Sequence, residues 1–282
     1  MRDHEMRRRG TIGIGGPAKV WYMPLSENEL ERSLKLIIKS GERFFISGNG
    51  SNVLFPDEGF NGVVVRPGEQ LSRWEYSERR LTASSGMSFS SILGECVKRG
   101  LSGLEFMAGI PATVGGAVKN NASSYGGAVI DVLEKILVLD ELGNKVWLSR
   151  PCLDAGYRKL RWPGGGTILR AVFSLKETSP KEVAGAVKTA LSQKLSSQPC
   201  EKRTLGCVFK NPVTGPPAWK LIHEAGMRDE REGGAAVSGK HANFIVNEGN
   251  ATSRDVSCLV EKIKSGVEKK FGVRLEEEIE IL

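Results

Sequence analysis

Residues 101–127, LSGLEFMAGIPATVGGAVKNNASSYGG, are the part of the chain best suited to holding an anion. Its glycines are Gly103, Gly109, Gly115, Gly116, Gly126 and Gly127. Because glycine has no Cβ, the backbone N–H groups of such a segment can approach a bulky anionic ligand closely. Pro111 is expected near the first position of a helix, where unpaired N–H donors bind phosphate readily. A tightly packed turn without a ligand explains the same glycines, so the segment alone leaves both interpretations open.

A second glycine-rich loop, GNGSN, spans residues 48–52. A run of backbone N–H donors, joined by the side chains of Ser51 and Asn52, is typical of a nest that binds phosphate. A tight connection between two strands would need the same residues. No GxGxxG sequence opens a helix here, so the loop does not indicate a dinucleotide-binding fold of the Rossmann type.

A candidate cation for a carboxylate lies further along the chain, in Gly156-Tyr157-Arg158. The planar guanidinium of Arg158 can bind a carboxylate through two parallel hydrogen bonds. A solvated surface arginine is the more common case, and the sequence alone favours it.

A candidate proton donor is Cys207, within LGCVFKNP at residues 205–212. A thiol has a pKa of about 8.5, so it is mostly protonated near neutral pH and can give up a proton. The alternative is a small buried hydrophobe, which is what free cysteines usually are.

The chain ends with a run of carboxylates, Glu276-Glu277-Glu278-Ile279-Glu280. An acidic tail is usually solvated. Here, however, Leu275, Ile279 and Ile281 indicate a short packed strand. We therefore expect some of these carboxylates to point inward.

The composition of the 282 residues bounds the classes of protein that fit. The net charge is +7, but the basic residues are spread along the chain apart from Arg7–Arg9, whereas nucleic-acid binders concentrate them among aromatic residues. Such an excess of positive charge also fits a protein that binds an anionic small molecule.

Five cysteines without a CxxC pair and three scattered histidines indicate neither a disulfide framework nor a metal site. No apolar run reaches ~18 residues and no secretory signal opens the chain, so we expect a cytoplasmic protein with no membrane partner.

The rest of the chain must supply the elements that position these residues. SENELERSLKLIIKSG is expected to form a helix, because Ser26 and Glu29 match a capping box and Gly41 can end it. Its buried stripe would be Leu30, Leu34, Ile37 and Ile38.

Other elements follow from turn signals and hydrophobic periodicity. Hairpins are predicted over 71–84, around Glu78-Arg79, and over 136–148, around ELGN. Further strands are predicted at 43–47, 62–66, 167–175, 207–210 and 243–247. Further helices are predicted at 88–99, 179–195, 218–225 and from near Thr252, the last burying Val256, Leu259, Val260, Ile263 and Val267. Residues 196–202 are expected to be a linker. Helices mixed with hairpins indicate an α+β fold.

The motifs taken together resemble the UDP-N-acetylenolpyruvoylglucosamine reductase family. The resemblance runs from TIGIGGPA at 11–18 to LEEEI at 275–279, which is almost the entire chain. Its most specific pieces are GLSGLEFMAGIPATVGGAV, GCVFKNP and KHANFIVN, in that order. Three of the motifs depart from the family pattern: GNGSN is usually a triple glycine, NASSYGG usually has one more glycine, and Cys207 is usually a serine.

The resemblance implies an FAD-binding domain of the vanillyl-alcohol-oxidase-like (PCMH) type, made of two α+β subdomains, and an α+β substrate-binding domain. The expected division is 1–66 and 67–178 for the subdomains and 196–282 for the substrate-binding domain, whose tail returns to the active site. The chain is similar to the compact members of the family, which lack an insertion that caps the substrate.

The resemblance also implies a cofactor, FAD, held without a covalent link because neither glycine-rich loop contains a histidine. FAD would lie between the two subdomains. The residues expected to hold it are Gly48, Asn49, Gly50, Ser51, Asn52, Gly109, Ile110, Pro111, Thr113, Gly115, Gly116 and Ala117.

The activity implied is the reduction, with NADPH as reductant, of the enolpyruvyl group of UDP-N-acetylglucosamine enolpyruvate to UDP-N-acetylmuramate for peptidoglycan. By position in the motifs, Arg158 and Glu278 would stabilise the charge that builds on the substrate carboxylate, and Cys207 would protonate the adjacent carbon. The residues expected to bind substrate are Tyr157, Lys210, Asn211, Lys240 and Asn243.

Two other hypotheses stay open at the level of the sequence. One is an FAD-linked oxidase of the same superfamily with another substrate, and the other is a basic protein that binds nucleotides or nucleic acid without catalysis. For the reductase we expect a monomer with a sugar nucleotide as its small-molecule partner, no nucleic acid and no metal.

Overall fold

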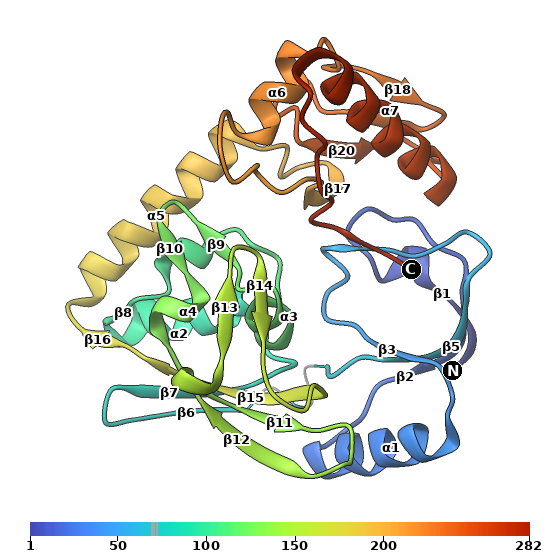
Figure 1. Ribbon diagram of the computed structural model, residues 1–282. Coiled ribbons are helices and arrows are strands. Elements are labelled where there is room, and N and C mark those ends of the chain that lie inside the picture. The colour runs from blue at the N-terminus through green and yellow to red at the C-terminus, as the bar shows by residue number, and fades with distance from the viewer. Residues whose placement is uncertain (69–70, 72) are drawn as a thin grey trace. The chain divides into compact units, whose positions relative to one another are not determined.

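The computed structural model describes residues 1–68, 71 and 73–282 (Figure 1). The chain forms two compact units. Unit 1 comprises Met1–Val20, Asn49–Asn61 and Lys194–Leu282, and unit 2 comprises Trp21–Gly48 and Gly62–Gln193. The predicted division into 1–66, 67–178 and 196–282 stays a prediction.

Helices and strands alternate irregularly along the chain, and most strand pairs are antiparallel (Figure 1). The helices are α1 (Glu27–Ser40), α2 (Phe89–Arg99), α3 (Val114–Lys119), α4 (Val129–Val132), α5 (Pro180–Ser197), α6 (Ala218–Glu224) and α7 (Ser253–Phe271), with short 3₁₀ turns η1 (Met6–Arg8), η3 (Glu105–Met107) and η4 (Arg150–Cys152). The strands are β1 (Arg2–Glu5), β2 (Pro17–Tyr22), β3 (Phe44–Ile46), β4 (Val53–Leu54), β5 (Phe60–Val65), β6 (Trp74–Ser77), β7 (Arg80–Ser84), β8 (Leu101–Ser102), β9 (Ser123–Ser124), β10 (Gly127–Ala128), β11 (Leu133–Leu139), β12 (Lys145–Ser149), β13 (Asp154–Gly156), β14 (Lys159–Arg161), β15 (Thr167–Ser174), β16 (Lys176–Glu177), β17 (Arg203–Cys207), β18 (Arg231–Glu232), β19 (Ala235–Val237), β20 (Phe244–Asn247) and β21 (Glu280–Ile281). The predicted α+β class is confirmed.

Unit 2 is built on a five-stranded sheet in the order β12-β11-β15-β7-β6. The hairpin β6–β7 turns at Glu78 and Arg79, whose φ angles are 50° and 64°, as the alternation predicted. Ser72, at the start of the predicted hairpin, lies outside the described residues. Helix α2 has the predicted ends, with Ser88 as N-cap and Gly100 in the left-handed region.

Helix α1 buries Leu30 and Leu34 of its predicted stripe in a cluster with leucines of β11 and β15, whereas Ile37 and Ile38 are only partly buried. Ser26 caps the helix by accepting from the N–H of Glu29. The Glu29 carboxylate does not complete the predicted capping box. It accepts instead from the N–H of Leu25 at 2.9 Å and from the Tyr22 hydroxyl at 2.5 Å, because the tyrosine lies within reach. These hydrogen bonds, that of Tyr22 first, lower the pKa of the Glu29 carboxyl.

Unit 1 is built on a four-stranded antiparallel sheet in the order β17-β20-β19-β18. Helix α7 begins as predicted, with Thr252 and Asp255 forming a reciprocal capping box, and ends at Gly272. Its buried residues are those predicted: Val256, Leu259, Val260, Ile263 and Val267.

Three boundaries differ from the predictions. The strand predicted at 207–210 is β17, which ends at Cys207, because side-chain hydrogen bonds take over the pairing beyond it. Helix α5 continues to Ser197, into the predicted linker, and stops before Pro199, since the residue that precedes a proline disfavours the helical region. Ile281 was expected to be packed, yet it is 46% exposed at the end of the two-residue strand β21.

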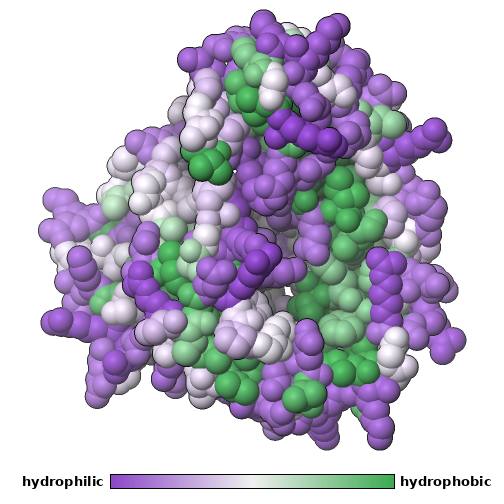
Figure 2. Space-filling model, in the orientation of Figure 1, coloured by the Kyte–Doolittle hydropathy of each residue, from purple (hydrophilic) through white to green (hydrophobic). Residues whose placement is uncertain are grey.

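On the face shown in Figure 2, hydrophilic residues cover most of the surface. Among the described residues, no helix combines the length and the apolar composition that a membrane span requires.

Asn247, at the end of β20, joins the N-terminal segment of unit 1 to its sheet. Its Nδ2 donates to the carbonyl of Ile12 at 2.9 Å, while its Oδ1 accepts from the N–H groups of Gly249 and Ala251 at 2.9 and 3.2 Å. The side chain is 8% exposed, so these partners cannot turn to water without a rearrangement.

We expect Asn247→Ala to lower the free energy of unfolding by about 3 kcal/mol, because buried backbone groups lose their hydrogen bonds. Asn61→Ala, at an exposed position of β5, is the matched control and should change it by less than about 0.5 kcal/mol. Urea unfolding followed by circular dichroism measures both. Equal effects of the two substitutions would contradict this role.

Candidate functional site

In unit 2, Gly48, the first residue of GNGSN, lies against Thr113 of the other predicted glycine-rich segment. A Cβ added to Gly48 would come within 2.5 Å of the Thr113 Oγ1 atom, so only glycine fits without a shift. Thr113 is the N-cap of α3, and its Oγ1 accepts from the N–H of Gly116 at 3.4 Å. The helix therefore starts at Val114. Pro111 lies outside it, which corrects the prediction of a first-turn proline.

The first N–H groups of α3 are already engaged. Val114 donates to the carbonyl of Met87 and Gly115 donates to that of Ser85, both at 2.8 Å. A Cβ on Gly115 would lie 3.0 Å from the Ser85 side chain, so this glycine serves close packing. Gly116 differs, since an added Cβ would have only the Thr113 hydroxyl, at 3.5 Å, within 4 Å. Of these two glycines, Gly116 is the one that a ligand can approach.

Arg158 occupies the tip of the hairpin formed by β13 and β14. Its φ of 57° places it in the left-handed region at the second turn position. Its Nη1 donates to the carbonyl and to the hydroxyl of Ser123, at 2.8 and 3.0 Å. The guanidinium carbon lies 5.5 Å from the centre of the Tyr157 ring. These contacts hold the guanidinium in one orientation.

The side chain of Asn121 binds the backbone of the same hairpin. This role of Asn121 was not predicted from the sequence. Its side chain is 6% exposed, and its Nδ2 donates to the carbonyl of Gly156 at 3.0 Å while its Oδ1 accepts from Ile130 N. The available signal was an asparagine in a glycine-rich segment, since asparagine tolerates a positive φ, which is 40° here. Together with Ser123, it attaches Arg158 to the segment that follows α3.

In unit 1, the C-terminal tail pairs with the residues that follow Cys207. Glu278 N donates to the carbonyl of Val208 at 2.7 Å, and Lys210 N donates to that of Glu276 at 2.8 Å. The predicted return of the tail therefore brings the backbone of Glu278 next to the residue that follows Cys207.

Asn243 secures this pairing from the other side. Its Oδ1 accepts from Phe209 N at 2.9 Å, its Nδ2 donates to the Phe209 carbonyl at 2.8 Å, and its own carbonyl accepts from Val208 N at 2.9 Å. The side chain is 4% exposed. Asn243 thus replaces the strand pairing that stops at Cys207, and its predicted contact with substrate stays a prediction.

The GNGSN loop reaches the tail through Asn52. Its Nδ2 donates to the Glu278 carbonyl at 3.0 Å, and its own carbonyl accepts from Glu280 N at 2.9 Å. Gly50, with a φ of 61°, packs so closely that a Cβ would lie 2.8 Å from the Arg9 carbonyl. One residue predicted to hold a cofactor therefore also holds the acidic tail.

Other residues predicted to bind substrate make contacts within unit 1. Lys210 forms an ion pair with Glu276, and the Asn211 side chain accepts from the N–H of Ala218 at the start of α6. Lys240 donates to a backbone carbonyl at the end of α5. Their roles toward a substrate stay predictions.

The two interpretations of a free cysteine, a proton donor and a small buried hydrophobe, can be compared at Cys207 and Cys96. Cys96 is fully buried in the core of unit 2, where burial raises the pKa of its thiol to about 12. Cys207 is only half-buried, at the end of β17. The interpretation as a small buried hydrophobe therefore fits Cys96 rather than Cys207.

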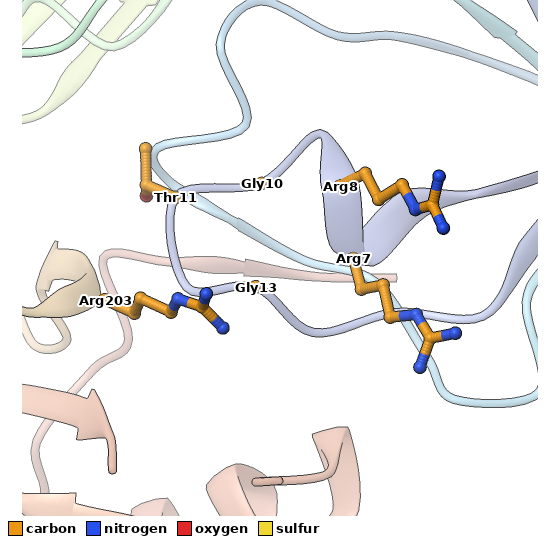
Figure 3. A pocket seen from close by; sticks show the side chains of 6 residues that line it. All are labelled: Arg7, Arg8, Gly10, Thr11, Gly13 and Arg203. Carbon is orange, nitrogen blue, oxygen red and sulfur yellow. The ribbon is translucent and has the colours of Figure 1, made fainter. Parts of the chain in front are cut away.

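A pocket of about 370 Å³ lies in unit 1, and none of the predicted site residues lines it (Figure 3). It is lined by Arg7, Arg8, Gly10, Thr11, Gly13 and Arg203. Arg7 also forms an ion pair with Glu5 at 3.2 Å. This pocket was not predicted, because Arg203 comes from a distant part of the chain. Across the described residues, no cluster of His, Cys, Asp or Glu could hold a metal ion.

The chain matches two protein-family models. Residues 18–149 match one described as an FAD binding domain. Residues 198–282 match the C-terminal domain of UDP-N-acetylenolpyruvoylglucosamine reductase.

Full-length relatives carry the same description. The chain is 39% identical to the UDP-N-acetylenolpyruvoylglucosamine reductase of Clostridioides difficile, over 99% of this chain and 92% of that one. It is 37% identical to that of Geobacter metallireducens, over 100% and 93%. The crystal structure of the reductase (MurB) from Thermus caldophilus matches with a TM-score of 0.86 at 34% identity, covering 99% of this chain and 98% of that one.

We expect Gly48→Ala to lower the free energy of unfolding by about 1–3 kcal/mol, because the added methyl group must displace the Thr113 hydroxyl. Removing that hydroxyl in Gly48→Ala/Thr113→Ala should recover part of the loss. Gly116→Ala, within α3 and away from other side chains, should be neutral or slightly stabilising. Additive effects of the two changes in the double variant would contradict the contact.

Proposed function

The chain belongs to the UDP-N-acetylenolpyruvoylglucosamine reductase family, and we propose that Arg158, Cys207 and Glu278 carry its chemistry. The protein is an FAD-dependent oxidoreductase with NADPH as reductant. It reduces the enolpyruvyl group of UDP-N-acetylglucosamine enolpyruvate to UDP-N-acetylmuramate in peptidoglycan biosynthesis. The observation that supports the residue assignment is the pairing of Glu278 with the residue after Cys207.

The residues of the glycine-rich loops fit FAD. Gly48 lies against Thr113, and Gly116 is open to a ligand. When bound, FAD would supply the hydride-transfer chemistry that links NADPH to the vinyl group. The residues proposed to hold it are those predicted in the two loops, 48–52 and 109–117.

Arg158 is proposed to bind the carboxylate of the enolpyruvyl group. Ser123 holds the Nη1 of its guanidinium through two hydrogen bonds, which sets the plane of the group. A planar guanidinium in a set orientation suits bidentate contact with a carboxylate. Because the donors are already placed, they stabilise the negative charge that builds on that carboxylate without reorganising.

Cys207 is proposed to protonate the carbon next to the one that receives the hydride. One hydride and one proton then saturate the double bond, and the thiolate that remains regains a proton from solvent. Cys207 is half-buried at the end of β17, and Asn243 fixes the backbone that follows it.

Glu278 is proposed to donate a hydrogen bond to the same substrate carboxylate in its protonated form. Its backbone is held on both sides, by Val208 through its N–H and by Asn52 through its carbonyl. A donor fixed in this way adds to the charge stabilisation by Arg158.

Family membership sets aside the two alternatives, the oxidase and the protein without catalysis. The monomeric state and the cytoplasmic location stay predictions of the sequence.

The purified protein should be yellow, with flavin absorbance near ~450 nm that bleaches on anaerobic addition of NADPH. The colour should return when UDP-N-acetylglucosamine enolpyruvate is added. An absorbance spectrum of the protein as purified, and after incubation with FAD, measures this. A colourless protein that FAD does not reconstitute would contradict the function.

Cys207→Ala should leave the reduction of FAD by NADPH within about twofold of wild type. It should slow the step with the enolpyruvyl substrate by about 10²–10⁴-fold, because the proton donor is gone. Cys207→Ser is the control that keeps a donor, and it should retain most of that step. Stopped-flow absorbance follows the two half-reactions separately. Equal loss in both would remove Cys207 from this role.

A further inference from the structure

The two carboxylates that precede Glu278 are each neutralised by a lysine from a different element. Glu276 forms an ion pair with Lys210, in the segment after β17. Glu277 forms one with Lys264, in α7. The tail therefore presents consecutive carboxylates whose surroundings differ, although the sequence gives them identical side chains.

Lys264 is the more buried of the two lysines. Its side chain is 11% exposed, against 27% for Lys210. Its Nζ lies 2.8 Å from the Oε1 of Glu277 and 2.7 Å from the Oε1 of Glu261. Glu261 is one turn back on the same helix, so Glu277 is the only one of the two partners that belongs to the tail.

The charges of this pair are stable. The hydrogen bonds that Lys264 donates to Glu261 and, second in effect, to Glu277 raise its pKa. Burial raises the pKa of Glu277, but the hydrogen bond and charge of Lys264 outweigh it, and the net pKa lies below the ordinary value of 4.5. Both groups are therefore ionised throughout the neutral range. A buried charge that loses its partner is costly, so this pair resists separation.

The direction of Glu277 determines that of its neighbour. Phe209 and Glu277 form an antiparallel bridge, with backbone hydrogen bonds on either side of it. In an extended strand, successive side chains point to opposite faces. A lysine that holds Glu277 toward α7 therefore keeps the side chain of Glu278 on the opposite face.

We propose that Lys264 is a positioning residue, whose ion pair with Glu277 holds the tail in the rotation that presents Glu278 to the substrate. The inference rests on the proposed function of Glu278. In this role Lys264 contacts neither substrate nor FAD. Its effect is to fix the tail against α7 and to keep the neighbouring carboxylate away from the substrate carboxylate, which it would repel.

The test uses the FAD-loaded enzyme carrying Lys264→Met, which keeps most of the side-chain volume. We expect the reduction of FAD by NADPH to stay within about twofold, and the step with the enolpyruvyl substrate to slow by about 10-fold or more, since a small misplacement of a catalytic group is enough. Lys264→Arg keeps the charge and should restore that step to within about threefold.

The matched control is Lys262→Met, on the same helix. Lys262 forms an ion pair at 2.5 Å with Glu230, which is not part of the tail. This variant should leave both half-reactions unchanged. If it slows the second step as much as Lys264→Met does, loss of helix stability explains the effect and the proposal is overturned.

A second measurement does not depend on turnover. Hydrogen exchange of the tail, residues 274–282, should be faster in Lys264→Met than in wild type or Lys262→Met. If Lys264→Met does not fold, Glu277→Gln serves in its place, with the same expected slowing of the second step. Unchanged exchange, or an equal slowing of both half-reactions, would overturn the proposal.

Glu278→Gln separates this inference from the one on which it rests. If Glu278→Gln leaves the second half-reaction intact, the proposed role of Glu278 fails. If Glu278→Gln slows that step while Lys264→Met and Glu277→Gln do not, only the positioning by Lys264 fails.

Discussion

The hydrogen bond from Glu278 N to the Val208 carbonyl is the constraint on which the site in unit 1 depends. It joins the last residues of the chain to a segment that begins far upstream, and neither part is a regular strand at that point. Both sides need further support. Asn243 supplies it to the segment after Cys207, and Asn52 supplies it to the tail. Without these side chains, the pairing would leave buried backbone groups without partners, at a cost comparable to the bond itself.

Asparagine side chains serve the same purpose elsewhere in the fold. Asn121 attaches the hairpin of Arg158 in unit 2, and Asn247 ties the N-terminal segment to the sheet of unit 1. An amide both donates and accepts, so one side chain can satisfy an N–H and a carbonyl where strand pairing stops. The irregular backbone around the proposed catalytic residues is therefore held by specific buried contacts, which gives it the rigidity that a preorganised site requires.

The elements predicted best from the sequence are those whose ends are specified by residues within one helical turn or one hairpin. Helices α2 and α7 begin at the side-chain caps Ser88 and Thr252, and α2 ends at Gly100 in the left-handed region. These signals are local, so the sequence alone predicted their positions. The strand at 207–210 was misplaced because its pairing depends on Asn243, far along the chain. Likewise Lys264 belongs to a helical pattern that is complete without it, and nothing local indicates that its charge lies against the tail.

The acidic tail shows why composition alone misjudges such segments. Three adjacent carboxylates in a solvated tail would be equivalent, and their mutual repulsion would favour an extended, mobile chain. Here Lys210 and Lys264 each neutralise one of them from opposite sides, and Leu275 and Ile279 bury the apolar positions around them. The repulsion is thereby removed where the tail must pack. Glu278, the third carboxylate, belongs to the stretch of the tail whose backbone pairs with the segment after Cys207, so its position follows from that pairing and not from the acidic composition of the run.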